Sequence, residues 1–354
     1  MLRLQARAEP SQTMRYLSPL IAVALTLICG LLIFSALGRD PIAGFQVFFL
    51  NPLKDGYSIA ELFLKATPLM LIAIGLAVGF RANVWNIGAE GQYIMGAIFG
   101  SGVALYFQGG TSPLILPTMV VAGALGGALW AAIPAMLRTR FNTNEILVSL
   151  MLVYIANLLV SWLVFGPWKD PEGFNFPQTK MFDDSAILPL LIEGTRLNAA
   201  FPIAIGALIA GYLFMNRSFP GFQMRVAGQA DAAARYAGFS AKRTIWIGLL
   251  AGGAMAGIAG MSEVGGPMGQ LTDHVSQNYG FAAIIVAFVG RLNALGIFLA
   301  SLLMALLYLG GEQAQQYMNL PSSISKVFQG MLLFFLLGAD IFVNYKLRLG
   351  AAKK

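Results

Sequence analysis

Polar side chains are concentrated in one short stretch of an otherwise apolar chain. The twelve residues that begin at Arg81 hold two charges and three amides, carried by Arg81, Asn83, Asn86, Glu90 and Gln92. Such groups are costly in hydrocarbon, so they must face protein, water or an aqueous boundary. A helix interrupted by such a polar segment can line a pathway through the membrane. We therefore take Asn83, Asn86, Glu90 and Gln92 as candidate residues of a solute pathway.

A second interruption comes later, where the apolar run Ile245–Met261 continues into glycines, a proline and Glu263. If the two interrupted runs belong to inverted repeats, they cross a membrane in opposite directions. Glu90 and Glu263 would then lie toward opposite faces, and Glu263 joins the pathway candidates. The run Ala66–Phe80 covers only about 22 Å as a helix, so the chain could also turn at depth within the membrane. An ordinary hairpin, with Glu90 paired to Arg81, is the alternative.

The elements that must position these residues are membrane-spanning helices. The 354 residues are 57% hydrophobic and 11% charged, which excludes an ordinary soluble fold. Long apolar runs favour an all-α polytopic membrane protein with about ten transmembrane helices in a single domain over residues 1–354. The predicted spans are 17–37, 66–80, 88–107, 114–137, 146–165, 198–215, 244–262, 281–290, 296–311 and 323–343.

Basic residues test the orientation of these spans independently. Ten crossings with a cytoplasmic amino terminus place 16 basic residues inside and 7 outside, which together are the 23 Lys and Arg of the chain. This predicts cytoplasmic tails at 1–16 and 344–354, an outer loop at 166–197 and a cytoplasmic loop at 216–243. The net charge of +7 is then explained by membrane orientation, and no nucleic-acid partner is expected. The first run exceeds a signal-peptide core in length, so we expect it to be retained, with cleavage as the minor alternative.

The loops could each contact a soluble partner. In the cytoplasmic loop, Asp231 can cap a short alanine-rich helix, and Gly238 suits the left-handed residue that follows a helix end. Such a surface helix could transmit force from a soluble protein, and a plain connecting loop is the alternative. For the proline-punctuated, acidic outer loop, we weigh a solvated loop against a docking surface for an extracytoplasmic partner.

Signals of chemistry within the chain are missing from the sequence. It contains no phosphate-binding loop of the Gly-x-x-x-x-Gly-Lys-Ser/Thr type, so ATP hydrolysis is not expected in this chain. Cys29 is the only cysteine and His274 the only histidine, so we predict no metal site and no catalytic residues. Glycines four residues apart, such as Gly253 and Gly257, predict close helix packing.

Four sequence blocks together resemble the nucleoside-type permeases of the ribose and branched-chain amino acid permease family of ATP-binding cassette importers. The first is Asn83–Gln92, the second Arg225–Gly238, the third Tyr279–Arg291, and the fourth Asn144–Ile146. The resemblance runs from about residue 60 to the carboxyl end.

This resemblance implies a type II-like permease with two inverted halves in the bacterial inner membrane. Its expected partners are a second, homologous permease subunit, an ATPase that binds ATP and Mg, an extracytoplasmic substrate-binding protein and membrane lipid. The second block resembles the coupling helix that docks into the ATPase. Its candidate coupling residues are Arg225, Gly228, Asp231, Arg235, Tyr236 and Gly238.

Three functions stay open at this point. The first is nucleoside import with ATP hydrolysed by a separate subunit. The second is a simple-sugar or branched-chain amino acid permease of the same construction. The third is an ion-coupled carrier that uses Glu90 or Glu263 as its proton or cation site.

Overall fold

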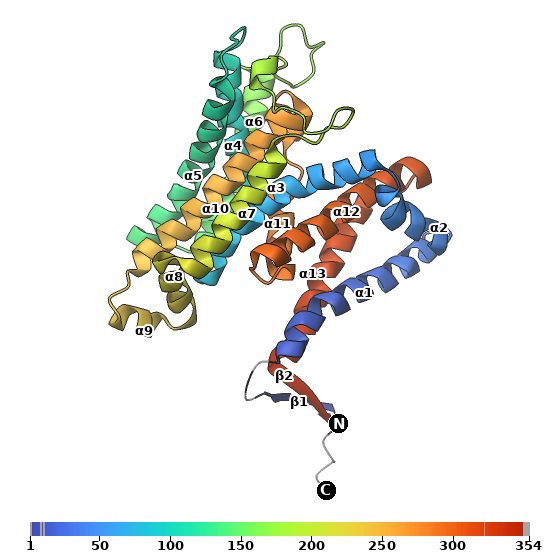
Figure 1. Ribbon diagram of the computed structural model, residues 1–354, viewed down its shortest axis with the longest axis vertical. Helices are drawn as coiled ribbons and strands as arrows, with labels where there is room; N and C mark the ends of the chain where they lie inside the picture. The colour runs from blue at the N-terminus through green and yellow to red at the C-terminus, as the bar shows by residue number, and fades with distance from the viewer. Residues whose placement is uncertain (1, 8, 10, 322, 350–354) are drawn as a thin grey trace. The chain divides into compact units, whose positions relative to one another are not determined.

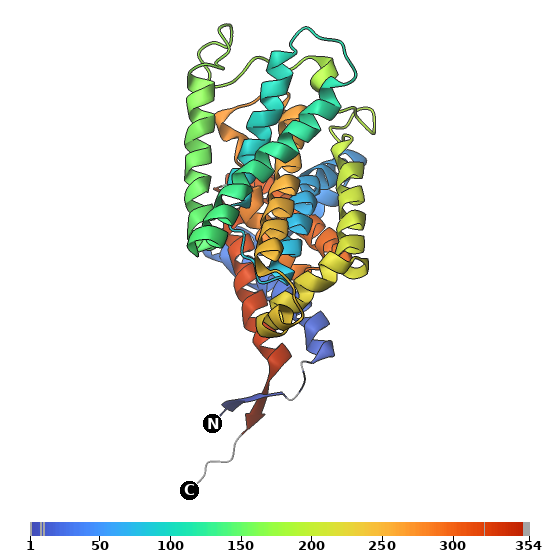
Figure 2. The same ribbon diagram turned by 90° about the vertical axis from the view of Figure 1, so that its left-hand side faces the viewer.

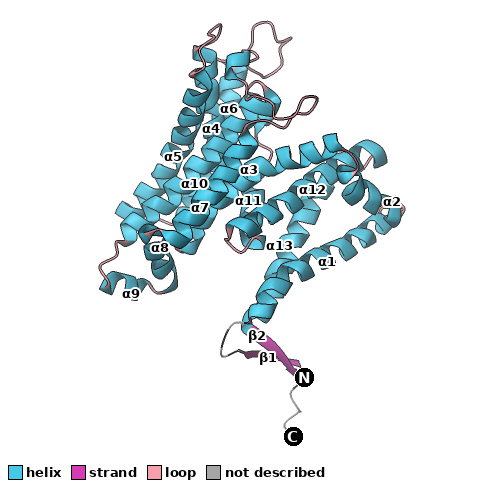
Figure 3. Cartoon of the chain, in the orientation of Figure 1, coloured by secondary structure: helices cyan, strands magenta, loops and turns pink. Residues whose placement is uncertain are grey.

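The computed structural model describes residues 2–7, 9, 11–321 and 323–349. Its regular structure is almost entirely helical (Figure 3). The chain forms two compact units, one from residues 60–305 and one that joins the first 59 residues with those after 305. The helices are α1 (Gln12–Ala36), α2 (Pro41–Phe45), α3 (Gly56–Arg81), α4 (Ala89–Tyr106), α5 (Ile115–Phe141), α6 (Glu145–Phe165), α7 (Ala200–Arg217), α8 (Phe219–Gln229), α9 (Asp231–Tyr236), α10 (Ala241–Glu263), α11 (Tyr279–Val289), α12 (Ala294–Met318) and α13 (Ser323–Asn344).

Each of the ten predicted spans coincides with one of these helices. In the described part of the chain, eight helices are long and apolar enough to cross a membrane, namely α1, α3, α5, α6, α7, α10, α12 and α13. The other two are α4, whose first turn carries Glu90 and Gln92, and α11, whose 11 residues cover about 16 Å. The all-helical polytopic fold is therefore confirmed.

Helix α3 is longer than its hydropathy predicts. It has 26 residues and a length of about 39 Å, enough to cross a core of about 30 Å, so the interpretation of a short helix is wrong. The depth of the turn that follows it stays a prediction. Hydropathy missed its first turns because they contain Glu61, which is 5% exposed and forms an ion pair with Arg196. Asp55 precedes the helix and accepts a hydrogen bond from the Ser58 backbone N–H at 2.8 Å, which holds the pKa of Asp55 below its usual value.

Glycines form the core of the 60–305 unit where α4, α5 and α10 lie side by side (Figures 1 and 2). Gly96 of α4 faces the Gly257 backbone of α10, and Gly127 of α5 faces the backbone of Gly253 and Gly257. A Cβ on any of these glycines would overlap the neighbouring helix, so the predicted close packing is confirmed. Because Gly100 lies against Met261 in the same register, α4 and α10 run in the same direction.

The other unit brings the two ends of the chain together. Helix α1 packs on α13, where the Ser18 hydroxyl donates to Asp340 at 2.7 Å, and Phe34, Phe48 and Phe328 form an aromatic cluster. Strands β1 (Leu2–Ala6) and β2 (Tyr345–Leu349) pair antiparallel (Figure 1). The predicted tails 1–16 and 344–354 thus contain a small sheet, and residues 1, 8, 10 and 350–354 lie outside the described chain. The cytoplasmic location of both tails stays a prediction.

The predicted outer loop, 166–197, is held to the segment that follows α10. The backbone N–H groups of Thr179, Phe182 and Leu188 donate to the carbonyls of Leu271, Gly269 and Gly265, respectively, at 2.6–2.9 Å. This loop lies at one end of the 60–305 unit, and α8 and α9 lie at the other (Figure 1). The loop is therefore held by backbone hydrogen bonds to residues 265–271. Docking of a partner on it stays a prediction.

The glycine core predicts a selective effect of one methyl group. Gly257→Ala places its Cβ against the Gly123 carbonyl, and overpacking of this kind costs about 1–3 kcal/mol of unfolding free energy. We expect a lower Tm in detergent, measured by thermal challenge and size-exclusion chromatography. Gly206→Ala on α7 is the control, because nothing lies within 4 Å of its added Cβ. Equal Tm values for the two variants would contradict the close contact.

Candidate functional site

Two buried amides at the start of α4 pair with each other. The Asn86 Nδ2 donates to Gln92 Oε1 at 2.8 Å, and the Gln92 Nε2 donates to Asn86 Oδ1 at 3.0 Å. Both side chains are 1% exposed, and Asn86 Oδ1 also accepts from the Gly88 backbone N–H at 3.1 Å. The pair satisfies most of its own polar atoms and closes the turn that leads into α4.

The Glu90 carboxylate is completely buried and bonded to a segment almost 190 residues away. It accepts hydrogen bonds from the Ser276 hydroxyl at 2.7 Å, the Asn278 N–H at 3.0 Å and the Gly280 N–H at 2.5 Å. These donors surround the first residue of α11, Tyr279, where helical N–H groups lack intrahelical partners and negative charge is favoured. Glu90 therefore caps α11, whose own cap residue, Asn278, makes no side-chain cap bond.

The alternative pairing of Glu90 with Arg81 is wrong. Arg81 donates to the Leu292 carbonyl from two nitrogens, at 3.1 and 2.8 Å, and to Asn216 Oδ1 at 3.1 Å. It therefore ties the end of α3 to the turn before α12 and to the end of α7. The local spacing suggested an ion pair, but each side chain has a partner far along the chain.

Glycines allow the close approach of backbones around Glu90. A Cβ at Gly280 would overlap the Glu90 backbone, and a Cβ at Gly88 would lie 2.7 Å from Ser149 atoms of α6. At Gly91 the Cβ would lie 3.0 Å from the Val153 Cα. We name Asn86, Glu90, Gln92, Ser276 and Gly280 the polar junction, since their contacts join the start of α4 to the start of α11.

Asn83 differs from the other candidates because its side chain is exposed. It has a left-handed backbone, with φ of 56°, and its Oδ1 accepts from the Trp85 indole N–H at 2.9 Å. Trp85 packs with Phe80 and Phe288 at ring-centroid distances of 5.3 and 5.8 Å. An exposed amide thus lies beside an aromatic cluster at the end of α3.

Glu263 is half-buried at the last residue of α10, before a π-helical turn over Val264–Met268. Since α4 and α10 run in the same direction, Glu90 precedes their glycine crossing and Glu263 follows it. The structure does not bring the two acids together. A place in the pathway stays a prediction for Asn83, Asn86, Glu90, Gln92 and Glu263.

Two ion pairs were missed by sequence reasoning. Glu145 is 5% exposed, pairs with Arg138 and accepts from the Trp85 N–H at 3.4 Å. It stands in the first turn of α6, directly after Asn144, whose Oδ1 accepts from the Ile146 N–H at 2.9 Å. An acid at the start of an apolar run was a visible signal for this pair. The Glu61 pair with Arg196 had no local signal, because its partner is 135 residues away.

The predicted coupling segment forms two helices rather than one. The backbone of Ala230, at φ −151° and ψ 83°, separates α8 from α9. Helix α9 begins at Asp231, so Ala230 rather than Asp231 occupies the cap position, and the Asp231 side chain lies outside the described part of the structure. Gly238 has φ of +78°, which confirms the predicted left-handed residue after the helix.

The coupling candidates divide by their contacts with the rest of the bundle. Arg225 donates to the Met215 carbonyl at 2.8 Å, and a Cβ at Gly228 would overlap the Arg81 carbonyl, so both residues hold α8 against its neighbours. Arg235 is exposed, and Tyr236 is 97% exposed. Helix α8 is therefore held by these contacts, and α9 buries Ala234 but exposes Arg235 and Tyr236.

No metal-binding cluster of His, Cys, Asp and Glu occurs among the described residues. The His274 side chain is 88% exposed and lies 3.6 Å from Asp273. An isolated surface histidine of this kind lacks the companions of a metal or nucleophilic site.

The fold and the polar junction define an all-helical, multi-pass membrane protein. Residues 58–337 match the family described as branched-chain amino acid transport system / permease component, and the chain belongs to this family.

A glucose ABC transporter permease protein of Haloferax volcanii is 33% identical over 98% of this chain and 93% of the relative. A nucleoside permease of Lactococcus lactis is 30% identical over 92% of each chain. A guanosine permease of Bacillus subtilis is 30% identical over 90% of this chain and 92% of the relative. The predicted family resemblance is confirmed.

The polar junction predicts a structural cost for loss of the Glu90 carboxyl group. Glu90→Gln replaces one acceptor oxygen with an amide that faces N–H donors, and a buried donor left without its acceptor costs about 1–3 kcal/mol. We expect a clearly lower Tm in detergent, with Glu172→Gln in the exposed outer loop as the control. An unchanged Tm for Glu90→Gln would show that the carboxylate does not stabilise α11.

Proposed function

We propose that this chain is the membrane-spanning subunit of an ATP-binding cassette importer of nucleosides in the bacterial inner membrane. A separate cytoplasmic subunit, which binds ATP and Mg, would hydrolyse the ATP. The observation that carries this proposal is the outward-facing helix α9 at the end of a bundle that belongs to a permease family.

The contacts of α8 support transmission of movement from α9 into the bundle. Helix α8 precedes α9 and is joined to it through the break at Ala230. Gly228 of α8 lies directly on the Arg81 backbone at the end of α3. Arg81 in turn holds the Leu292 carbonyl between α11 and α12. A displacement of α9 would therefore reach α3 and the turn after α11 through packed contacts. The polar junction fixes the opposite end of α11.

The expected partners follow from the family and its paired members. Lactococcus lactis has a second nucleoside permease, 26% identical to this chain over 80% of its length, beside the one at 30%. Bacillus subtilis likewise has a second guanosine permease, 26% identical over 67% of this chain. Two related permeases in one organism support a homologous heterodimer. A cytoplasmic ATPase, an extracytoplasmic binding protein and membrane lipid complete the proposed assembly, with both termini cytoplasmic.

Nucleosides fit the side chains near the end of α3. A nucleoside is uncharged, so its recognition uses amide hydrogen bonds and stacking on aromatic rings. The exposed Asn83 amide beside Trp85, Phe80 and Phe288 offers both groups. The nucleoside and guanosine relatives support the same substrate class.

A simple sugar is the second candidate substrate. The glucose permease of Haloferax volcanii favours it, since it is 33% identical over nearly the whole chain. Hexoses and the ribose of a nucleoside share hydroxyl groups, which amides can bind in the same way. The two classes differ in the base, which can stack on an aromatic ring.

Competition for uptake separates these substrates. In membrane vesicles that contain the complete importer, we expect labelled guanosine to accumulate with ATP and unlabelled nucleosides to compete, while excess glucose does not. Trp85→Ala should lower the apparent affinity about tenfold, because base stacking contributes about 1–3 kcal/mol. Trp246→Ala, at the start of α10, is the matched control. Glucose accumulation with no guanosine competition would favour the sugar permease.

The exposed end of α9 predicts a specific loss of coupling. Tyr236→Ala removes a 97% exposed side chain, so the Tm of the purified permease should not change. We expect weaker association with the ATPase and uptake reduced at least several-fold, measured by pull-down and transport with the intact complex. Tyr106→Ala is the control, since Tyr106 is 82% exposed at the other end of the bundle. Normal association and uptake for Tyr236→Ala would count against the coupling role of α9.

A further inference from the structure

Two aromatic side chains project from the predicted outer loop, 166–197. Phe174 is 93% exposed and Phe176 is 63% exposed. We name these two residues the aromatic tip. Neither the polar junction nor the coupling segment contains this tip. Exposed apolar side chains that lie together among polar residues mark a surface that a partner covers.

The backbone presents the tip in an unusual shape. Phe174 has φ of +48° and Asn175 has φ of +68°, so two consecutive residues lie in the left-handed region. This conformation is rare and strained for an aromatic residue, and such strain is commonest at functional sites. Pro171 and Pro177 restrict the backbone on either side of the tip.

Hydrogen bonds close the base of the tip and hold this shape. The Asp170 N–H donates to the Gln178 carbonyl at 2.9 Å, which joins the two sides of the turn. The Lys169 ammonium donates to the side-chain oxygen of Asn175. The chain that follows the tip is bonded in turn to residues 265–271. A surface whose shape exists before binding loses less entropy when a partner covers it.

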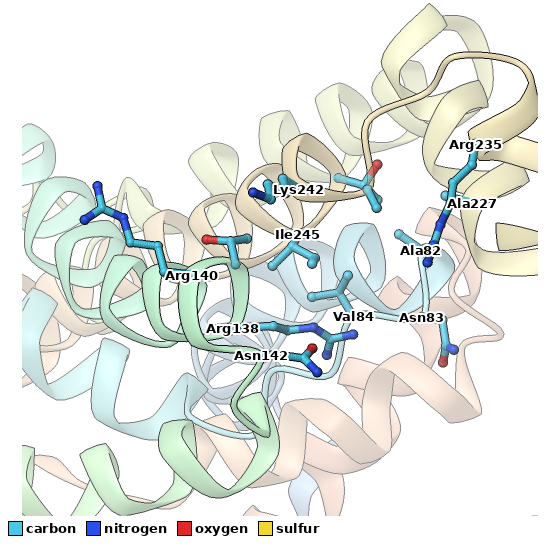
Figure 4. A pocket seen from close by; sticks show the side chains of 13 residues that line it. Ala82, Asn83, Val84, Arg138, Arg140, Asn142, Ala227, Arg235, Lys242 and Ile245 are labelled. Carbon is cyan, nitrogen blue, oxygen red and sulfur yellow. The ribbon is translucent and has the colours of Figure 1, made fainter. Parts of the chain in front are cut away.

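The tip lies at the end of the 60–305 unit opposite α8 and α9 (Figure 1). Lys and Arg residues gather at the α9 end, where Arg138, Arg140, Arg235 and Lys242 line a cavity of about 420 Å³ (Figure 4). Segments rich in Lys and Arg favour the cytoplasmic side of a membrane, whatever their acidic content. In the proposed importer the tip therefore faces the extracytoplasmic side.

The residues beside the tip favour a protein rather than a lipid surface as its partner. Asp170 and Glu172 lie within four residues of Phe174, and Glu172 is exposed. Carboxylates are costly in hydrocarbon and are repelled by anionic headgroups, so they oppose insertion of the tip into a bilayer. An aromatic ring with polar groups around it is typical of a protein–protein hot spot, where the ring fills a pocket of the partner.

We propose that the aromatic tip is the docking point for the extracytoplasmic substrate-binding protein. Phe174 would fill an apolar pocket of that protein, and Phe176 would exclude water beside it. This inference rests on the proposed function, which supplies both the partner and the side of the membrane. It holds for a nucleoside importer and for a sugar importer alike.

Binding of the purified binding protein to the complete importer in nanodiscs tests the role of the tip. We expect Phe174→Ala to weaken this binding about 30-fold, the loss typical of an aromatic hot spot. Phe174→Tyr keeps the aromatic ring and should retain most of the affinity. Because the Phe174 side chain is 93% exposed, Phe174→Ala should leave the Tm and the basal rate of ATP hydrolysis unchanged.

The matched control is Phe141→Ala, since Phe141 is 67% exposed at the other end of the unit. It should bind the binding protein as the unmodified importer does. Unchanged affinity in Phe174→Ala would overturn the proposal and leave the importer function intact. If the unmodified importer does not bind the binding protein at all, the proposed assembly fails and this inference fails with it.

The bilayer is the other surface that the tip could meet. A fluorophore attached to Phe174→Cys in a Cys29→Ala background reports this contact in nanodiscs that contain brominated lipid. We expect no quenching by the lipid, and quenching by the added binding protein or its shielding of the fluorophore from aqueous iodide. Quenching by brominated lipid would assign the tip to the bilayer and overturn the proposal.

Discussion

The arrangement of the 60–305 unit depends on one buried carboxylate. Glu90 is completely buried, and its bonds come from a hydroxyl and two backbone N–H groups rather than from Arg81. A buried carboxyl group is costly unless hydrogen bonds replace its hydration, so the start of α11 must stay against the start of α4. This constraint requires Gly280, where any larger residue would push the two backbones apart. It also leaves the chain that enters α4 with a fixed turn, which Asn86 and Gln92 close from within.

Two further buried acids hold helices together through ion pairs. One ion pair joins segments distant in the chain, between Glu61 and Arg196, and the other joins adjacent helices, between Arg138 and Glu145. Both acids are 5% exposed. Helices of a membrane protein gain little from hydrophobic association, so such ties and glycine contacts supply the specificity of packing. Arg235 and Tyr236 are exposed at the end of the same bundle. The proposed coupling site uses this exposed end.

Hydropathy predicted the ten helices because apolar length is a local property of the sequence, and glycine spacing predicted the crossing of α4, α5 and α10 for the same reason. The start of α3 was missed because Glu61 looked unsuited to a span until Arg196 supplied its charge partner. Likewise, Glu90 was set against the nearby Arg81, whereas its partners lie beyond residue 275. No proline marks the break at Ala230, which follows Gly228 by two residues, and α8 is held in place by contacts with Arg81 and Met215. Contacts between residues distant in sequence thus determine these features, and local sequence patterns could not reveal them.

We propose that the chain supplies a passage and that a separate ATPase supplies the energy. The purified chain can be reconstituted alone in proteoliposomes, with labelled nucleoside outside and a proton or sodium gradient imposed. We expect no accumulation above liposomes without protein, and accumulation only after the second permease, the ATPase, the binding protein and ATP are added. Accumulation by the single chain, driven by the ion gradient, would contradict it and would favour a self-sufficient carrier.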